Sequence, residues 1–180
     1  MDVLTFVFYK GGDFVEAQEL ILDGLKSSFL DSNIKSNIDY KSEFVSNNLK
    51  EGKKVISYIE EELQRCDSFK ISVAFITMSG IVPLLQTLKE LESKGIKGQI
   101  LTTNYLNFSE PEALKKLASL SNVEIKMYVT DPNGEGFHTK GYIFEGKEIY
   151  RFIVGSSNMT QKALAVNHEW NTKIISAPSR

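Results

Sequence analysis

FKISVAFITMSGIVPLLQTLKELESKGIKGQILTT, residues 69–103, is the stretch that decides the fold class. It begins with a strand-like run, 69–75, and ends with another, 97–103. Between them lies a predicted helix that Ser79 caps and Gly95 ends. The apolar face of this helix consists of Ile81, Leu84, Leu85, Leu88 and Leu91. A strand, a helix and a second strand in this order predict one unit of a parallel sheet covered by helices.

The elements on either side continue this alternation. Apolar residues at helical spacing predict a helix over 55–66, directly before the first strand. Ser109 and Glu112 form a capping-box signature for a helix that runs to Leu120, and 123–129 is a further strand. We therefore predict an α/β fold, with a mostly parallel, mixed β-sheet and helices on both faces.

The first fifty residues are less regular. Residues 3–9 are strand-like, 14–30 have the spacing of an amphipathic helix, and 31–49 are rich in Ser, Asn and Lys. We expect residues 1–180 to form a single domain, with 1–50 as an N-terminal extension. We also expect the chain to be the N-terminal part of a longer protein.

The composition is that of an ordinary globular protein, with 42% apolar and 24% charged residues. No apolar run reaches the roughly 20 residues of a membrane span, and the N-terminus lacks the pattern of a secretory signal. We therefore expect a cytoplasmic protein that does not bind membranes. One cysteine, Cys66, and two histidines provide no zinc-site spacing, and no phosphate-binding loop of the ATPase type is present. We predict neither a metal nor a cofactor.

Charge is distributed unevenly along the chain. The net charge is -2, which argues against a surface that binds polyanions throughout. From residue 137 to the end there are six Lys or Arg against three Asp or Glu, whereas residues 1–136 have 15 against 20. The positive excess coincides with the region that contains the motifs.

Polar residues that could bind and attack a phosphate lie in this basic region. In the strand-like run 137–144, a period of two places His138 and Lys140 on one face, roughly 6.6 Å apart along the chain. Gly155, Ser156 and Asn158 follow the next strand and open a short predicted helix, where backbone amides and the Asn158 amide could bind phosphate. The next run, 167–175, places Asn167, Glu169 and Asn171 on one face, with His168 and Trp170 on the other.

These segments resemble the motifs of the phospholipase D superfamily. HTK at 138–140 is similar to its HxK motif, GSSN at 155–158 to its GSxN motif, and Glu169 within NHEWN to its downstream glutamate. The wider wording, over roughly residues 52–176, resembles nuclease domains at the N-terminus of bacterial helicase-like and restriction proteins. Three motifs in this order are far more specific than an HxK alone.

The resemblance implies a mechanism without a metal. His138 would attack phosphorus and form a phosphohistidine, which splits the hydrolysis into two easier steps. Lys140 and Asn158 would hold the non-bridging oxygens, and Glu169 would accept a hydrogen bond from the second nitrogen of His138. The superfamily takes the proton for the leaving oxygen from a second HxK motif, and this sequence contains only one. We therefore expect a homodimer with the active site at its two-fold interface, where two His138 side chains would meet.

Several nearby residues are interpreted as structural. Glu145 stands where the superfamily has an aspartate, and His168 faces away from Glu169. Trp170 is assigned to the core rather than to a base-stacking platform. One of Ser156 and Ser157 is expected to bind phosphate and the other to close the turn, and the sequence does not distinguish them. The turn-forming residues 131–136 precede His138 and are expected to form a mobile rim of the site.

Three functions remain open at this point. The leading hypothesis is hydrolysis of DNA by a nuclease domain that acts beside helicase or specificity domains of the same polypeptide. A second is a catalytically silent module for dimerisation or nucleic-acid binding, which the negative net charge and the single motif keep open. A third is hydrolysis of phospholipid head groups. The sequence contains no obvious amphipathic segment that would dock to a membrane, which argues against this function.

Overall fold

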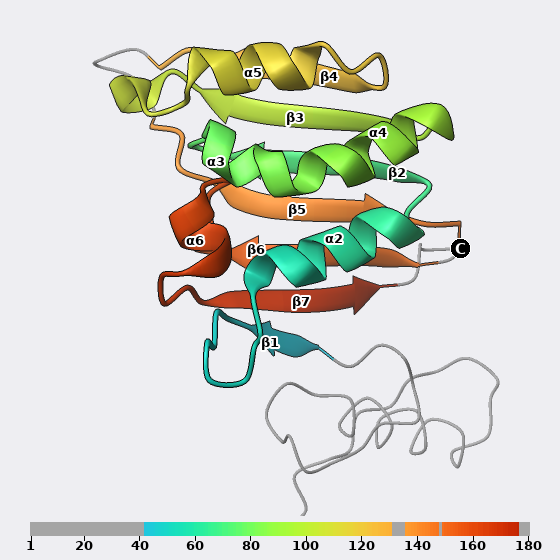
Figure 1. Ribbon diagram of the computed structural model, residues 1–180, viewed down its shortest axis with the longest axis vertical. Helices are drawn as coiled ribbons and strands as arrows, with labels where there is room; N and C mark the ends of the chain where they lie inside the picture. The colour runs from blue at the N-terminus through green and yellow to red at the C-terminus, as the bar shows by residue number, and fades with distance from the viewer. Residues whose placement is uncertain (1–41, 131–135, 148, 177–180) are drawn as a thin grey trace, which may run out of the picture. The chain divides into compact units, whose positions relative to one another are not determined.

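A mixed seven-stranded sheet forms the centre of the fold, in a computed structural model that describes residues 42–130, 136–147 and 149–176. The predicted strand 3–9 and helix 14–30, and most of the segment 31–49, lie outside these residues. The strands follow the order β1-β7-β6-β5-β2-β3-β4 across the sheet (Figure 1). Their bounds are β1 Glu43–Val45, β2 Ser68–Val73, β3 Lys97–Thr103, β4 Val123–Tyr128, β5 Lys140–Glu145, β6 Tyr150–Gly155 and β7 Asn171–Ser176.

The sheet consists of a parallel half and an antiparallel half. β2, β3 and β4 pair in parallel, and each is followed or preceded by a helical crossover. β5, β6, β7 and β1 pair antiparallel, and β5 also joins β2 antiparallel. The predicted α/β class and mixed sheet are confirmed, but the expectation of a mostly parallel sheet is wrong. β5 and β6 are joined by residues 146–149 alone, and such a short connection permits only a hairpin.

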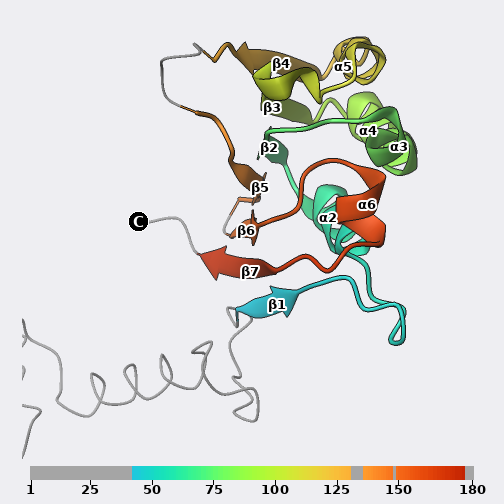
Figure 2. The ribbon, with the colours of Figure 1, turned by 90° about the vertical axis from the view of Figure 1, so that its left-hand side faces the viewer.

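The described helices all lie on one face of the sheet, as the view from the side shows (Figure 2). Their bounds are α2 Val55–Arg65, α3 Met78–Ile81, η1 Val82–Leu84, α4 Leu85–Ser93, η2 Tyr105–Asn107, α5 Pro111–Ala118 and α6 Gln161–Ala165. The prediction of helices on both faces is therefore wrong for the described residues. The opposite face carries the exposed side chains of Lys70, Gln99, Glu124 and Lys126, with the half-buried Leu101 among them.

The predicted elements agree with the structure in position and differ in their ends. Strand 97–103 is confirmed residue for residue. Thr77 rather than Ser79 caps α3, because its hydroxyl accepts a hydrogen bond from the Gly80 amide at 3.2 Å. Ser109 does not cap α5 either. Its hydroxyl accepts a hydrogen bond from the Ile76 amide at 3.2 Å, and the helix begins at Pro111.

Helix α2 packs its apolar side against the antiparallel half and carries a buried charge there. Val55, Ile59 and Leu63 belong to the core, and Glu62 is 0% exposed. The Glu62 carboxylate lies 2.6 Å from Lys173 Nζ on β7 and 3.3 Å from Arg151 Nε on β6. The contacts have ion-pair distances without hydrogen-bond geometry. Two cations thus neutralise one buried carboxylate beneath the helix.

Candidate active site

The predicted site residues gather at one edge of the sheet, where β2 and β6 end and β5 and β7 begin. Val73 pairs with Lys140, and Gly155 pairs with Asn171, so the register brings the ends of these four strands together. Two contacts hold the segment before β5 at this edge. Phe137 stacks on Tyr128 at 5.5 Å, and the Thr139 hydroxyl lies 2.6 Å from that of Ser72.

The side chains of His138 and Lys140 meet in the structure. Lys140 Nζ lies 2.8 Å from His138 Nδ1 and donates to the His138 carbonyl oxygen at 2.8 Å. The expectation that these two residues act together agrees with this geometry, although β5 begins only at Lys140, so His138 precedes the strand. The ring of Phe75, just after β2, contacts the His138 ring edge to face at 5.8 Å.

The contact between Lys140 and His138 determines the proton on the ring. A charged ammonium can only donate, so Nδ1 accepts and the hydrogen of a neutral imidazole lies on Nε2. Burial lowers the pKa of Lys140, and the nearby carboxylate of Glu169 opposes this effect by raising it. Lys140 is therefore a lysine whose positive charge is easier to remove than usual.

Gly155 and Ser156 connect the end of β6 to the segment that carries Glu169. The Ser156 amide donates to the Trp170 carbonyl at 3.0 Å, and the Trp170 amide donates back to the Ser156 hydroxyl at 3.0 Å. The same hydroxyl donates a short hydrogen bond to the Glu169 carboxylate. A Cβ atom at Gly155 would lie 2.2 Å from the Trp170 carbonyl oxygen, so only glycine permits this approach.

Ser157 and Asn171 form a buried support beneath this loop. The Asn171 amide group donates to the Ser157 hydroxyl at 2.9 Å and accepts from the Ser157 backbone amide at 3.3 Å. The buried Tyr142 hydroxyl donates to the Ser157 carbonyl at 3.0 Å, and burial raises the pKa of Tyr142. Ser157 is therefore the serine that closes the turn, and Ser156 is exposed. The Tyr142 contact could not be predicted from the sequence, because it joins β5 to the loop after β6.

Asn158 joins the loop to the end of β2. Its Oδ1 accepts a hydrogen bond from the Phe75 amide at 3.1 Å, which leaves its Nδ2 as the group directed elsewhere. The predicted helix does not open at Asn158. It begins at Gln161, and the Thr160 hydroxyl caps it by accepting from the Ala163 amide at 3.3 Å. Gly155 and Ser156 therefore do not lie at the start of a helix, where the sequence predicted that backbone amides would help to bind phosphate.

The remaining sequence interpretations have mixed outcomes. Glu145 lies at the far end of β5, where it accepts from Ser68 at 2.5 Å and pairs with Lys70 at 2.6 Å, in agreement with a structural role. His168 lies beside a cavity of about 460 Å³ lined by residues 46–50. Trp170 is 74% exposed, so its assignment to the core is wrong. The adjacent Asn171 is buried, and the alternation of side chains turns Trp170 outward. Residues 131–135 of the predicted rim lie outside the described residues.

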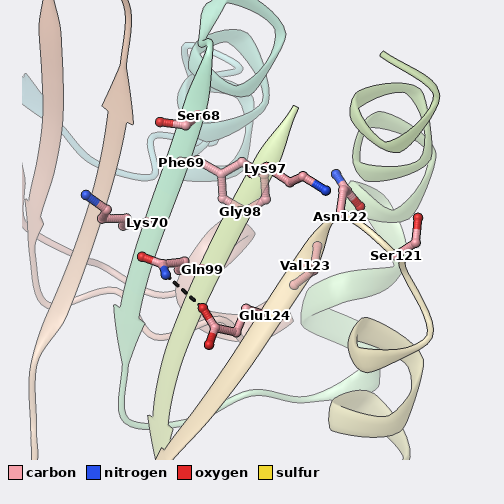
Figure 3. A pocket seen from close by; sticks show the side chains of 10 residues that line it. All are labelled: Ser68, Phe69, Lys70, Lys97, Gly98, Gln99, Ser121, Asn122, Val123 and Glu124. Atoms are coloured by element: carbon pink, nitrogen blue, oxygen red, sulfur yellow. Dashed lines mark hydrogen bonds between the residues drawn. The ribbon is translucent and has the colours of Figure 1, made fainter. Parts of the chain in front are cut away.

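Two cavities differ in their relation to this site. One of about 460 Å³ lies where β2, β3 and β4 begin, at the opposite end of the parallel strands, and contains none of the predicted site residues (Figure 3). The other, of about 620 Å³, borders the site through Phe75 and is named the Phe108 groove after its exposed aromatic wall. It is lined by Phe75, Thr77, Ser79, Phe108, Thr160, Gln161 and Lys162. Sequence reasoning did not identify this groove.

Within 42–130, 136–147 and 149–176, no group of three or more His, Cys, Asp or Glu side chains is arranged to hold a metal ion. None of the described helices has the length and apolarity that crossing a membrane requires.

A family model described as "Cardiolipin synthase, PLD-like domain" matches residues 59–179. No curated protein sequence matches the chain. Among solved structures, NucT from Helicobacter pylori is similar with a TM-score of 0.59 and 19% identity, over 75% of this chain and 85% of that protein. Nuc from Salmonella typhimurium, a phospholipase D family member, gives 0.53 and 17%, over 74% and 82%. A mutant of yeast tyrosyl-DNA phosphodiesterase 1 gives 0.53 and 12%, over 77% of this chain and 33% of that enzyme. At these identities the structural matches show a shared fold.

Proposed function

This chain belongs to the phospholipase D-like family, as its motifs implied, and we propose that it hydrolyses phosphodiester bonds in DNA without a metal. The observation that supports this most is the meeting of His138 with Lys140 beside the Ser156–Glu169 pair. A nucleophile, a cation and a carboxylate thus gather at one exposed edge of the sheet. A purely structural cluster of this composition would be expected to be buried and fully paired.

In the first step, a ring nitrogen of His138 attacks phosphorus. The new N–P bond forms as the bond from phosphorus to the leaving oxygen breaks, and a proton passes to that oxygen. In the second step, water attacks the phosphohistidine and gives a proton to the group that protonated the leaving oxygen, the N–P bond breaks, and the phosphate monoester leaves. Lys140 and the Asn158 amide hold the non-bridging oxygens, where negative charge grows in the transition state.

The attack requires a change in the partners of His138. With Lys140 donating to Nδ1, the neutral ring carries its proton on Nε2 and that atom cannot attack. A bound phosphate is a stronger partner for the ammonium and would draw Lys140 away. Nδ1 could then take the proton and donate to Glu169, whose carboxylate is near enough to raise the pKa of Lys140. Substrate binding would thereby produce the reactive tautomer.

The proton for the leaving oxygen is assigned to a second copy of the chain. The family mechanism uses two HxK motifs, and this sequence has one, at 138–140. In a two-fold dimer one of the two facing His138 side chains would carry the proton and act as the acid while the other stays neutral as the nucleophile, because two facing imidazoles repel a second positive charge. Sedimentation that finds a fully active monomer would contradict this part of the proposal.

DNA is the proposed substrate because the motifs resemble those of nuclease domains in helicase-like and restriction proteins. The names of the structural neighbours are compatible with it, since one is a tyrosyl-DNA phosphodiesterase and the others are named NucT and Nuc. We place the chain in the cytoplasm, as a module beside helicase or specificity domains. The second candidate is a silent binding module, and the exposed aromatic side chains near the site would serve it equally well.

Cleavage of plasmid and single-stranded DNA in excess EDTA tests the proposal. The wild-type chain is expected to cleave, and His138→Ala is expected to be inactive. His168→Ala is the matched control, because it removes the other histidine from a cavity lined by different residues. An inert wild type would favour the silent module, and activity that EDTA abolishes would contradict the metal-free mechanism.

A further inference from the structure

The Phe108 groove shares a wall with the predicted nucleophile. The Phe75 ring contacts the rings of both His138, at 5.8 Å, and Phe108, at 5.1 Å, in edge-to-face geometry. The Phe75 amide is in turn fixed by Asn158. A molecule in the groove would therefore lie directly beside a phosphate that contacts His138.

Phe108 is held in an exposed position by its loop. It is 56% exposed, although the Phe75 ring is within reach to cover it. Leu106 and Asn107, just before it, both have positive φ, at 54° and 52°, which is costly for leucine. The loop is anchored at both ends, because Asn104 Oδ1 accepts from the Thr130 amide at 2.9 Å and the Glu110 amide donates to the Ile76 carbonyl at 2.8 Å. A strained, anchored loop that presents an aromatic ring to solvent is typical of a binding site.

The rest of the groove suits a phosphodiester backbone. Lys162 supplies a positive charge and makes no ion pair with any described residue. Thr77, Ser79 and Thr160 add hydroxyls, and no acidic side chain lines the groove. Its volume of about 620 Å³ lies within the range of about 300–1,000 Å³ that small-molecule sites occupy.

We propose that the Phe108 groove binds the unpaired nucleotide next to the scissile phosphate, with its base stacked on Phe108 and its further phosphate near Lys162. The inference rests on the proposed function and adds a preference for single-stranded substrate, since a base within a duplex cannot present its face to the ring. Stacking on an aromatic face tolerates any base, so the groove supplies position rather than sequence specificity.

Binding of a labelled oligothymidylate to the full chain, measured by fluorescence anisotropy in EDTA, tests this proposal. His138→Asn is the background in every variant, so that no cleavage occurs. Phe108→Ala is expected to weaken binding about ten-fold, because stacking contributes on this order per base. Phe108→Leu should weaken binding as much as Phe108→Ala, since leucine preserves the packing and lacks a ring face. Phe108→Trp should bind like the background, since tryptophan provides a ring face.

Matched controls separate the groove from a general surface effect. Phe44 is 51% exposed and has one edge-to-face partner, Trp170, at 6.1 Å, so Phe44→Ala removes a comparable ring outside the groove. Lys97→Ala removes an exposed lysine from the cavity of Figure 3, as a control for Lys162→Ala. Both controls are expected to bind like the background. Lys162→Ala should weaken binding and reduce its salt dependence by about one phosphate contact.

A deoxyribose-phosphate polymer without bases distinguishes stacking from other roles. Phe108→Ala should not change its binding, whereas Lys162→Ala should. Equal losses on both polymers, a Phe108→Leu variant that binds like the background, or a loss at Phe44→Ala as large as at Phe108→Ala would each overturn the proposal. So would Phe108-dependent binding to vesicles of phosphatidylglycerol, which would assign the groove to lipid. If the wild type does not cleave DNA but the binding results hold, the proposed hydrolysis fails and the groove stands.

Discussion

Glu62 and Glu169 each lie near a lysine on the same sheet, and their surroundings are opposite. Glu62 is fully buried under α2, and Lys173 and Arg151 both lie within ion-pair distance of it. Glu169 is half-buried at the edge of the sheet and accepts a hydrogen bond from the Ser156 hydroxyl. Its negative charge acts on Lys140 through space and raises the pKa of that lysine. In the first group the buried carboxylate is balanced by cations on two strands. In the second, the lysine bonds a neutral histidine and retains capacity for an anion.

This difference separates a cluster that holds the fold from one that can react. Removing Glu62 leaves Lys173 and Arg151 without their counter-charge, which costs stability. Removing a member of the His138 group leaves groups that water can still solvate, so stability should change little. Catalysis and unfolding therefore respond to different substitutions, and both can be measured on the same variants.

The largest effect is expected for His138→Asn in the reactive group. DNA cleavage should fall at least about 10⁴-fold, the order found when a covalent nucleophile is lost. The free energy of unfolding should change by less than about 0.5 kcal/mol, because the His138 side chain is exposed. Cleavage assays and urea denaturation of the same preparation check both values. A variant that loses stability in parallel with activity would make His138 part of the structural group.

Glu62→Ala in the structural group should have the opposite profile. It leaves Lys173 and Arg151 close together without their carboxylate, and we expect a loss of about 3–5 kcal/mol in the free energy of unfolding. The folded fraction should still cleave DNA. Replacement of all three side chains by apolar ones of similar size should recover much of the stability, because no buried charge remains. A triple variant less stable than Glu62→Ala would show that the ion pairs are themselves required.

The same contrast explains what the sequence could predict. Both ends of strand 97–103 were predicted correctly, because turn signals bound its run and a predicted helix connects it to the preceding strand. The antiparallel half was misjudged, since whether a strand returns beside its neighbour depends on a short turn such as 146–149. Thr77 replaced Ser79 as a cap because two hydroxyl residues two positions apart are equally good candidates on sequence alone.

The motifs predicted that His138, Lys140, Ser156 and Glu169 belong to one site. The fold places all four at one edge of the sheet. The supporting contacts could not be predicted in this way. The Tyr142 hydroxyl bonds Ser157, and Phe108 lies beside Phe75. Both contacts join residues far apart in the sequence, and the order of the strands decides which of such residues touch. Alternation did predict that Trp170 and Asn171 face opposite ways, but not which face is buried.

A smaller effect is expected from pH, through the charge of Lys140. Burial lowers the pKa of Lys140 below its ordinary value of 10.5, so its ammonium is lost at lower pH than that of a free lysine. In a His138→Asn background, binding of inorganic phosphate should therefore weaken as the pH rises towards 10.5, because the Lys140 ammonium is already being lost below that value. Lys140→Arg should keep its binding through this range, since a guanidinium remains charged. The two variants behaving alike would mean that Lys140 does not bind the anion.

The smallest effect is expected at Glu145, an ion pair at the other end of β5. Hydrogen bonds from Lys70 and Ser68 lower the pKa of Glu145 below 4.5, so its contribution to stability is present above that pH and is lost as the pH falls through the lowered pKa. Glu145→Gln should therefore reduce the free energy of unfolding by about 1 kcal/mol at neutral pH, and the difference from wild type should vanish in acid. Urea denaturation at pH 7 and at about pH 3 measures this, with Glu112→Gln as the control, because the Glu112 pair with Lys115 is far more exposed. A change in DNA cleavage by Glu145→Gln would bring this residue into the reactive group, since its distance from His138 predicts none.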